Sequence, residues 1–219
     1  MHDGIDTAFF CPKQNAKLVL PSSKLDLSHA DEIVTYVSRG MEPYRGFPQF
    51  MEAVSLLQKR RPRCHAVIVG EDRVAYGKPL ADGKTYKQVM LEKLDIDSSR
   101  IHFTGLLPYS AYRQVLQASS VHVYLTRPFV LSWSMLEAMS AGCLLVASGT
   151  PPVTEIIQDK VNGLLVDFFS PREIADRVEE ALDNPDRMAS IRIKARETIR
   201  EKYDLAALLP RHLEWISEA

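Results

Sequence analysis

Short apolar runs alternate with amphipathic stretches along most of the chain, and this alternation predicts strands and helices in turn. The predicted strands are apolar runs at 33–38, 65–70, 101–104, 121–126, 144–147 and 163–168. Between these runs, apolar residues recur every three or four positions, as on one face of a helix. The predicted helices are 46–60, 84–94, a stretch from 108, a short helix around Glu137, 153–158, 171–182, 186–203 and 205–216.

Strands that alternate with helices predict an α/β fold with a doubly wound, parallel, six-stranded sheet and helices on both faces, as in Rossmann-like domains. The strands are continuous apolar runs, as expected where both faces of a sheet are covered. We expect this domain to span 31–204. Residues 1–30 contain Pro12, Pro21 and a polar run, and they predict an irregular arm or interdomain segment. Residues 205–219 predict a separate terminal helix.

Composition narrows the function classes. The 219 residues carry 27 basic and 28 acidic side chains, whereas a nucleic-acid partner would favour a basic excess. Three cysteines lie far apart, without a metal-ligand spacing, which favours free thiols in a reducing, cytoplasmic compartment. No apolar run is long enough to span a membrane. The basic cluster at 59–63 ends a predicted helix, and either a solvated helix end or a phosphate or membrane contact fits it.

Two arginines follow the first predicted strand, in "SRGMEPYRGF". Arg39 and Arg45 lie on a tight loop that contains Gly40, Pro43 and Gly46. Ligands of doubly wound sheets bind outside the carboxyl ends of the strands. Guanidinium groups there suit a diphosphate, because each can make bidentate bonds to phosphate oxygens. The alternative is a pair of surface arginines at a helix start, although a cation there opposes the helix dipole.

The stretch "RPFVLSWSMLEAMSAGCLLVAS" joins the fourth and fifth predicted strands. Ser132 and Ser134 are candidate N-caps, and the free amides of a helix that begins there would form an anion site. Glu137 lies one turn further along. A carboxylate accepts hydrogen bonds, so the vicinal hydroxyls of a ribose would match it. A glutamate that pairs with a buried arginine or caps the helix fits the sequence equally well. Trp133 is either core or a cover over the site.

Several familiar sites are missing or better explained otherwise. No G-x-G-x-x-G follows a strand, and no phosphate-binding P-loop or G-x-S-x-G elbow occurs. The acidic pair Asp95 and Asp97 ends a predicted helix, which is typical of a capping turn rather than a metal site. His102 and His122 lie inside predicted strands, which favours core histidines over ligands. We therefore expect neither a bound metal nor a resident cofactor.

Four segments resemble family 4 glycosyltransferases of the GT-B fold, specifically their carboxyl-terminal, donor-binding half. "HDGIDTAFFCP" resembles the segment by which these enzymes enter their second domain, and "VSRGMEPYRGF" resembles V-G-R-L-x-x-x-K-G. "LEAMSAGCLLVAS" resembles L-E-A-M-A-x-G-x-P-V-V-A-S, and "TPPVTEIIQDKVNGLLVD" resembles x-x-P-E-I-I-x-D-G-x-N-G-x-L-V. The segments occur in the family's order, from about residue 2 to residue 203.

The resemblance implies a role for each matched position. Arg39 and Arg45 would neutralise the diphosphate of a nucleotide-sugar, and Glu137, the second acid of the family's E-x7-E motif, would bind the ribose. The base would rest on the backbone at Leu106 and Leu107. Phosphates would meet the backbone from Leu131 to Ser134, through Ser132 and Trp133, with Gly40 also in the donor site. Glu155 would be structural.

Two departures from the pattern stand out. The first acid of E-x7-E is expected eight residues before Glu137, where the chain has Phe129. The turn usually reads E-G-F-G but reads F-V-L-S here, so its backbone has less freedom than a glycine turn. These changes leave open which sugar is transferred and which group replaces the acid.

The resemblance implies transfer of a sugar from a nucleotide-diphosphate donor to an acceptor hydroxyl, with retention at the anomeric carbon. The acceptor site of such an enzyme comes from an amino-terminal domain, which we expect to be the partner of this half. Peripheral membrane contact of the full enzyme stays open. The alternatives are a non-catalytic nucleotide or nucleotide-sugar binding module, and a purely structural interaction domain that binds no nucleotide.

Overall fold

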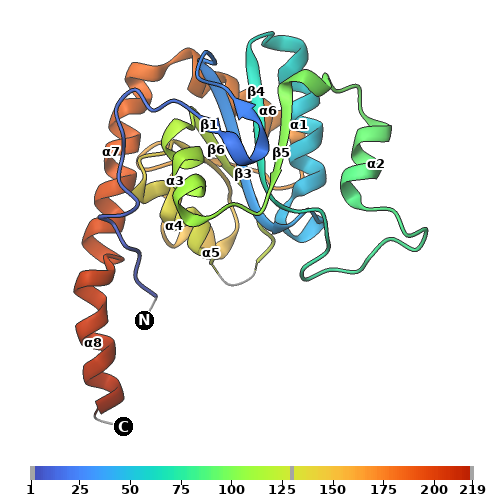
Figure 1. The fold of residues 1–219 in the computed structure, drawn as a ribbon. Coiled ribbons are helices and arrows are strands. Elements are labelled where there is room, and N and C mark those ends of the chain that lie inside the picture. The colour runs from blue at the N-terminus through green and yellow to red at the C-terminus, as the bar shows by residue number, and fades with distance from the viewer. Residues whose placement is uncertain (1–2, 129–130, 218–219) are drawn as a thin grey trace.

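The computed structural model describes residues 3–128 and 131–217, and a six-stranded parallel sheet lies at its centre (Figure 1). The strand order is β5-β4-β3-β6-β7-β8, and every neighbouring pair is parallel. The strands are β3 Glu32–Gly40, β4 Cys64–Glu71, β5 Ile101–Gly105, β6 Val121–Tyr124, β7 Leu145–Ser148 and β8 Leu164–Val166. The predicted fold class and strand number are confirmed.

Helices cover both faces of this sheet. On one face α1 and α6 pack on the strands, and on the other α3, α4, α5 and the later part of α7 do so. The helices are α1 Phe47–Arg60, α2 Tyr86–Lys93, α3 Tyr109–Ala118, α4 Trp133–Ser140, α5 Pro151–Thr154, α6 Pro171–Asp183, α7 Pro185–Lys202 and α8 Leu205–Ser217. Three short 3₁₀ helices are η1 Pro21–Ser23, η2 Pro43–Arg45 and η3 Ser98–Arg100.

The apolar spacing of α1 shows how the sequence produces this packing. Phe47, Phe50, Met51 and Leu57 recur at helical spacing and are at most 2% exposed, so a continuous stripe faces the sheet. Gly46 precedes the helix at φ +68°, in the left-handed region where glycine pays no steric penalty. The basic residues that end α1 pair with acids. Arg61, directly after α1, bonds Glu32 and Asp183 and its side chain is only 16% exposed, so this helix end is ion-paired rather than solvated.

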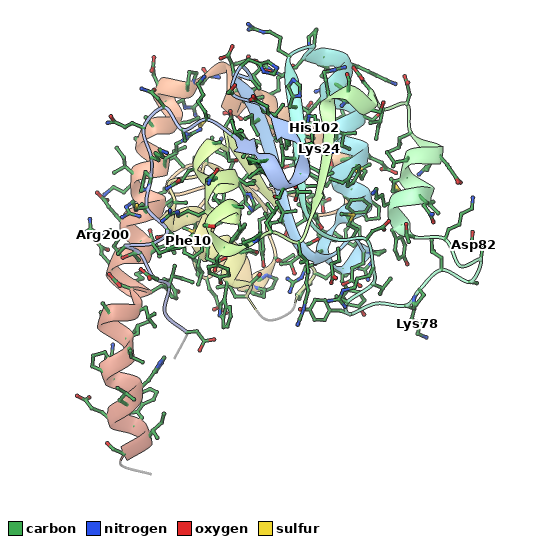
Figure 2. All side chains as sticks on the ribbon, in the orientation of Figure 1. Phe10, Lys24, Lys78, Asp82, His102 and Arg200 are labelled. Carbon is green, nitrogen blue, oxygen red and sulfur yellow. The ribbon has the colours of Figure 1, made fainter. Side chains whose placement is uncertain are left out.

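The arm that precedes the sheet is more ordered than the sequence suggested. It contains a two-stranded antiparallel hairpin of β1 Val19–Leu20 and β2 Leu25–Asp26. The arm also packs on the domain: Phe10 is 2% exposed, and Arg196 of α7 donates to the carbonyls of Phe10 (3.0 Å) and Thr7 (3.2 Å). Figure 2 labels Phe10 where the arm meets the body. The prediction of an irregular segment was therefore wrong for the hairpin.

The strand order reverses between β3 and β6. From β3 the chain builds β4 and β5 outward on one side, and then returns to place β6 against the other side of β3. The loops that follow β3 and β6 therefore leave the same edge of the sheet and diverge, which opens a crevice for ligands. The arginine loop and the stretch before α4 are these two loops.

Buried polar and sulfur groups fit the expected structural roles. His122 is fully buried in β6, and its Nδ1 lies 2.8 Å from the Thr35 hydroxyl of β3. Cys64 and Cys143 are buried free thiols, and burial raises the pKa of each to about 12. Asp97 caps η3 by accepting a 2.9 Å bond from the Ser99 amide, so the predicted capping turn is confirmed.

Candidate functional site at the strand switch point

Arg45 is anchored at the switch point by one side-chain and one backbone hydrogen bond. Its Nη1 donates a 2.9 Å hydrogen bond to the Thr126 hydroxyl, which follows β6. Its backbone carbonyl accepts a 2.8 Å bond from the buried Tyr36 hydroxyl of β3. These bonds fix the guanidinium across the crevice from the α4 loop. An arginine held in this way loses little further side-chain freedom when it binds an anion.

Arg39 and Arg45 line one hollow together with the start of α4. The described residues that line it are Val37, Ser38, Arg39, Arg45, Tyr76, Tyr124, Leu125, Ser132 and Ser134. Two guanidinium groups and five hydroxyl-bearing side chains, two of them at the start of α4, thus converge at the switch point. Four of the predicted site residues, two arginines and two serines, are brought together. This combination of cations and hydrogen-bond donors suits a polyanion.

The start of α4 is organised by Ser132. The Ser132 hydroxyl accepts a 3.3 Å bond from the Ser134 amide, so Ser132 is the N-cap, and its own amide donates to the Tyr124 hydroxyl at 3.2 Å. Trp133 is 57% exposed, and its indole donates to Asp3 at 3.2 Å. Trp133 is therefore not core. Leu131 is half-buried beside this turn, whereas Phe129 lies outside the described residues.

Glu137 is buried behind this turn and bound by two tyrosines of α3. Its exposed fraction is 5%, and its Oε1 and Oε2 accept bonds from the hydroxyls of Tyr109 (2.9 Å) and Tyr112 (2.8 Å). Burial raises the pKa of the carboxyl group, and the two phenol bonds partly oppose that shift. Neither alternative considered for Glu137, a buried arginine partner or a helix cap, is what the structure shows. Each oxygen keeps one acceptor position beyond its tyrosine.

The other predicted donor-site positions lie around this centre. Leu106 is 65% exposed directly after Gly105 (φ +69°), and Leu107 is half-buried. Gly40 is buried, and a β-carbon there would lie 2.6 Å from the Arg73 carbonyl. Gly40 thus makes room for the loop after β4. Contact of these three residues with a ligand stays a prediction.

Sequence reasoning missed three groups at this site: Tyr76, Glu42 and Thr126. The Arg45 guanidinium carbon lies 5.3 Å from the centre of the Tyr76 ring, and both residues also line an adjoining pocket with Tyr44 and Thr126. Tyr76 belongs to a polar loop, and nothing local marks it. Glu42 is fully buried. The sequence did not single it out, because it follows the strand in a turn, where acidic residues are common.

Within 3–128 and 131–217, no group of three or more histidine, cysteine, aspartate or glutamate side chains is arranged to hold a metal ion. In the same residues, no helix combines the length and the apolar character needed to cross a membrane.

The chain is similar to known glycosyltransferases. The family model described as "Glycosyl transferases group 1" matches residues 22–198. Alpha-D-kanosaminyltransferase of Streptomyces kanamyceticus is 29% identical over 179 residues, which cover 80% of this chain and 42% of the relative. D-inositol 3-phosphate glycosyltransferase of Corynebacterium glutamicum is 25% identical over 183 residues, covering 83% of this chain and 42% of that protein. The chain thus spans less than half the length of these curated relatives.

Solved structures show the same fold. Alr3699/HepE of Anabaena, solved in complex with UDP-glucose, superimposes with a TM-score of 0.80 at 21% identity, over 99% of this chain and 56% of that one. The C-terminal domain of LpcC, a glycosyl transferase group 1 family protein of Francisella tularensis, gives a TM-score of 0.74 at 22% identity. That match covers 92% of this chain and the whole of that domain. The predicted Rossmann-like half of a GT-B fold is confirmed.

Proposed function

Because the chain belongs to the glycosyl transferases group 1 family, we propose that it binds the nucleotide-sugar donor of a retaining glycosyltransferase. The observation that carries the proposal is the convergence of Arg39 and Arg45 with the Ser132–Ser134 turn on one hollow at the switch point. The enzyme would move the sugar from a nucleotide diphosphate to an acceptor hydroxyl in glycan biosynthesis.

The two arginines would carry most of the leaving-group chemistry. When the bond between the sugar and the diphosphate breaks, negative charge grows on the departing diphosphate. Arg39 and Arg45 would neutralise this charge, and the amides at the start of α4 would add hydrogen bonds to it. Donors that are already in place stabilise a developing charge without reorganising at the moment of reaction. The bond from Arg45 to Thr126 supports this assignment, since it holds the guanidinium before any ligand arrives.

Glu137 would bind the ribose and the segment at 106–107 would support the base. The free acceptor positions of the Glu137 oxygens suit two neighbouring hydroxyls, and Tyr109 and Tyr112 would keep the carboxylate oriented. Leu106 offers an exposed apolar surface for the flat base. UDP is the first nucleotide to test, because HepE was solved with UDP-glucose.

Calorimetric titration with UDP, GDP and ADP, and with their monophosphates, tests the proposal. We expect at least one nucleoside diphosphate to bind more tightly than its monophosphate. Arg45→Ala should lower the affinity for that diphosphate at least tenfold, because it removes a charged hydrogen bond. Arg172→Ala is the matched control, because that arginine is 84% exposed on α6. Equal binding by wild type and Arg45→Ala would contradict the proposed donor site.

Transfer needs the acceptor, which the proposal assigns to an amino-terminal domain. We therefore expect the chain of 219 residues to bind donor and transfer no sugar by itself. When the chain is incubated with nucleotide-sugar, added acceptor sugars should not increase the release of nucleotide diphosphate above the rate seen with water alone. If the full enzyme also binds nucleotide-sugar without turnover, the chain belongs to a non-catalytic binding protein instead.

A further inference from the structure

A buried carboxylate holds the start of the loop that joins β4 to α2. Three consecutive amides, those of Ala75, Tyr76 and Gly77, donate to Glu42 at distances of 2.7 to 3.2 Å. Glu42 is fully buried and follows β3 on the arginine loop. An ionised carboxylate that accepts several amide bonds makes strong, short-range contacts. The backbone of residues 75–77 is therefore fastened to the arginine loop.

Two glycines allow this close approach. A β-carbon at Gly40 would lie 2.6 Å from the Arg73 carbonyl and 3.1 Å from the Ala75 amide. A β-carbon at Gly77 would lie 3.0 Å from the Glu42 carboxylate. Neither glycine has a positive φ, so what both positions lack is space for a side chain. The loop is thus seated tightly on the strand end, whereas its later part, where Figure 2 labels Lys78 and Asp82, stands away from the sheet.

The fastened loop places Tyr76 among the arginines. Its ring lies over the Arg45 guanidinium at 5.3 Å and lines the same hollow as Arg39 and the α4 start. Hydrogen bonding to Arg39 lowers the pKa of the Tyr76 phenol. A phenol carries an O–H donor in addition to its acceptor lone pairs. That O–H is one more donor in a hollow that already carries two guanidinium groups.

We infer that Tyr76 binds the diphosphate directly and that Glu42 is the residue that positions it. The Tyr76 hydroxyl would donate to a phosphate oxygen held between Arg39 and Arg45. The four bonds from the 75–77 amides to Glu42 keep this hydroxyl in place. The inference rests on the proposed function, since it adds a ligand contact to the same donor site.

Tyr76→Phe tests the direct contact, because it removes only the hydroxyl and keeps the ring over Arg45. Titration with UDP, GDP and ADP and with UMP, GMP and AMP identifies the diphosphate that wild type binds best. We expect Tyr76→Phe to lower the affinity for that diphosphate about tenfold, because a hydrogen bond to a charged group has about that effect. The affinity for the corresponding monophosphate should not change. Tyr86→Phe is the matched control, since that hydroxyl donates to the Lys78 carbonyl in the outer part of the same loop.

Glu42→Gln tests the positioning role, because an amide nitrogen cannot accept the loop amides. We expect Glu42→Gln to lower the diphosphate affinity, as Tyr76→Phe does. The double variant should bind the diphosphate no more weakly than Tyr76→Phe alone. If Glu42 had only a structural role, Glu42→Gln would lower the affinities for diphosphate and monophosphate alike. Its effect would then add to that of Tyr76→Phe in the double variant. If Glu42→Gln does not fold, Tyr76→Phe still decides whether the phenol binds the ligand.

The outcomes separate the two ideas. Normal diphosphate affinity in Tyr76→Phe, together with weak affinity in Arg45→Ala, would overturn the inference and leave the donor site standing. If wild type binds no diphosphate better than its monophosphate, the donor site itself is wrong and the role of Tyr76 falls with it.

Discussion

Tyr112 of α3 donates a 2.8 Å hydrogen bond to Glu137 of α4, and both residues are buried. The bond joins two helices on the same face of the sheet. Tyr109, one turn earlier and 57% exposed as a residue, donates to the other carboxylate oxygen. The two tyrosine hydroxyls therefore hold the Glu137 carboxylate in one orientation.

Replacing Tyr112 should destabilise the fold more than replacing Tyr109. Tyr112→Phe leaves a buried carboxylate oxygen without its donor, which typically costs about 1–3 kcal/mol. Tyr109→Phe should cost less, because water reaches the exposed side of that ring and can replace the phenol. Urea denaturation of both variants measures the difference. Equal, small losses in the two variants would show that water already reaches Oε2.

The Glu137 carboxyl group should make stability and binding depend on pH in opposite directions. Because burial raises its pKa in the folded state above the ordinary 4.5, the folded chain holds this proton more tightly than the unfolded chain. This residue's stabilising contribution is therefore fully present below pH 4.5 and is lost as pH rises through the folded pKa. Affinity for a ribose should increase over the same window, because the ionised carboxylate is the better acceptor.

Glu137→Gln isolates this effect from the other carboxyl groups. The difference in unfolding free energy, wild type minus variant, should fall as pH rises above 4.5, and urea denaturation at several pH values measures it. The nucleotide affinity of the variant should lack the rise seen in wild type. A difference in stability that does not change with pH would contradict the raised pKa.

Gly46 should tolerate substitution much less than Gly83, although both have positive φ angles of +68° and +76°. A β-carbon at Gly46 would lie 2.5 Å from that of Leu125, whereas nothing lies within 4 Å at Gly83. Gly83→Ala should therefore cost about 1 kcal/mol, the left-handed penalty alone. Gly46→Ala should cost about 2 kcal/mol or more, because overpacking is added. Chemical denaturation compares them, and equal losses would mean that Leu125 moves aside freely.

The stacked histidines at the sheet edge should lower stability in acid. Nδ1 of His65 lies 3.0 Å from Nε2 of His102, and burial lowers the pKa of both below 6.5. A depressed histidine pKa gives stability that is present above the unfolded pKa and is lost as pH falls. The unfolding free energy should thus decline between pH 7 and pH 5. His102→Gln should reduce this decline, and His212→Gln on α8 should not; identical declines in all three proteins would exclude the pair.

Much of the fold could be predicted because each element has a local signal. The apolar stripe of α1 and the continuous apolar strands specify both the element type and the layers. The short helix after β7 was predicted at 153–158 but spans Pro151–Thr154. Thr150 is extended, and a proline already has the dihedral angle of a first helical residue. The side chain of Asn162 then accepts from the Gln158 amide, so the chain turns there instead.

The site was predictable only where its residues follow a strand end. The arginines and the serines could be found from their place at the carboxyl edge. The partners of Glu137 come from 25 and 28 residues away, and no sequence spacing marks them. Glu42 and Tyr76 are joined through backbone amides, which any residue supplies. Such contacts become visible only when the loop is seen on the strand.

The parallel bridge between Ile5 and Asp204 gives the domain a mechanical property. Ile5 donates to the Tyr203 carbonyl at 2.7 Å, and its own carbonyl accepts from the Leu205 amide at 2.9 Å. The bridge closes the chain between residues 5 and 204, so tension between residues 3 and 217 would load its two hydrogen bonds first. The bridge would break before force reached the sheet, so the crevice would keep its shape while the ends of the chain were pulled.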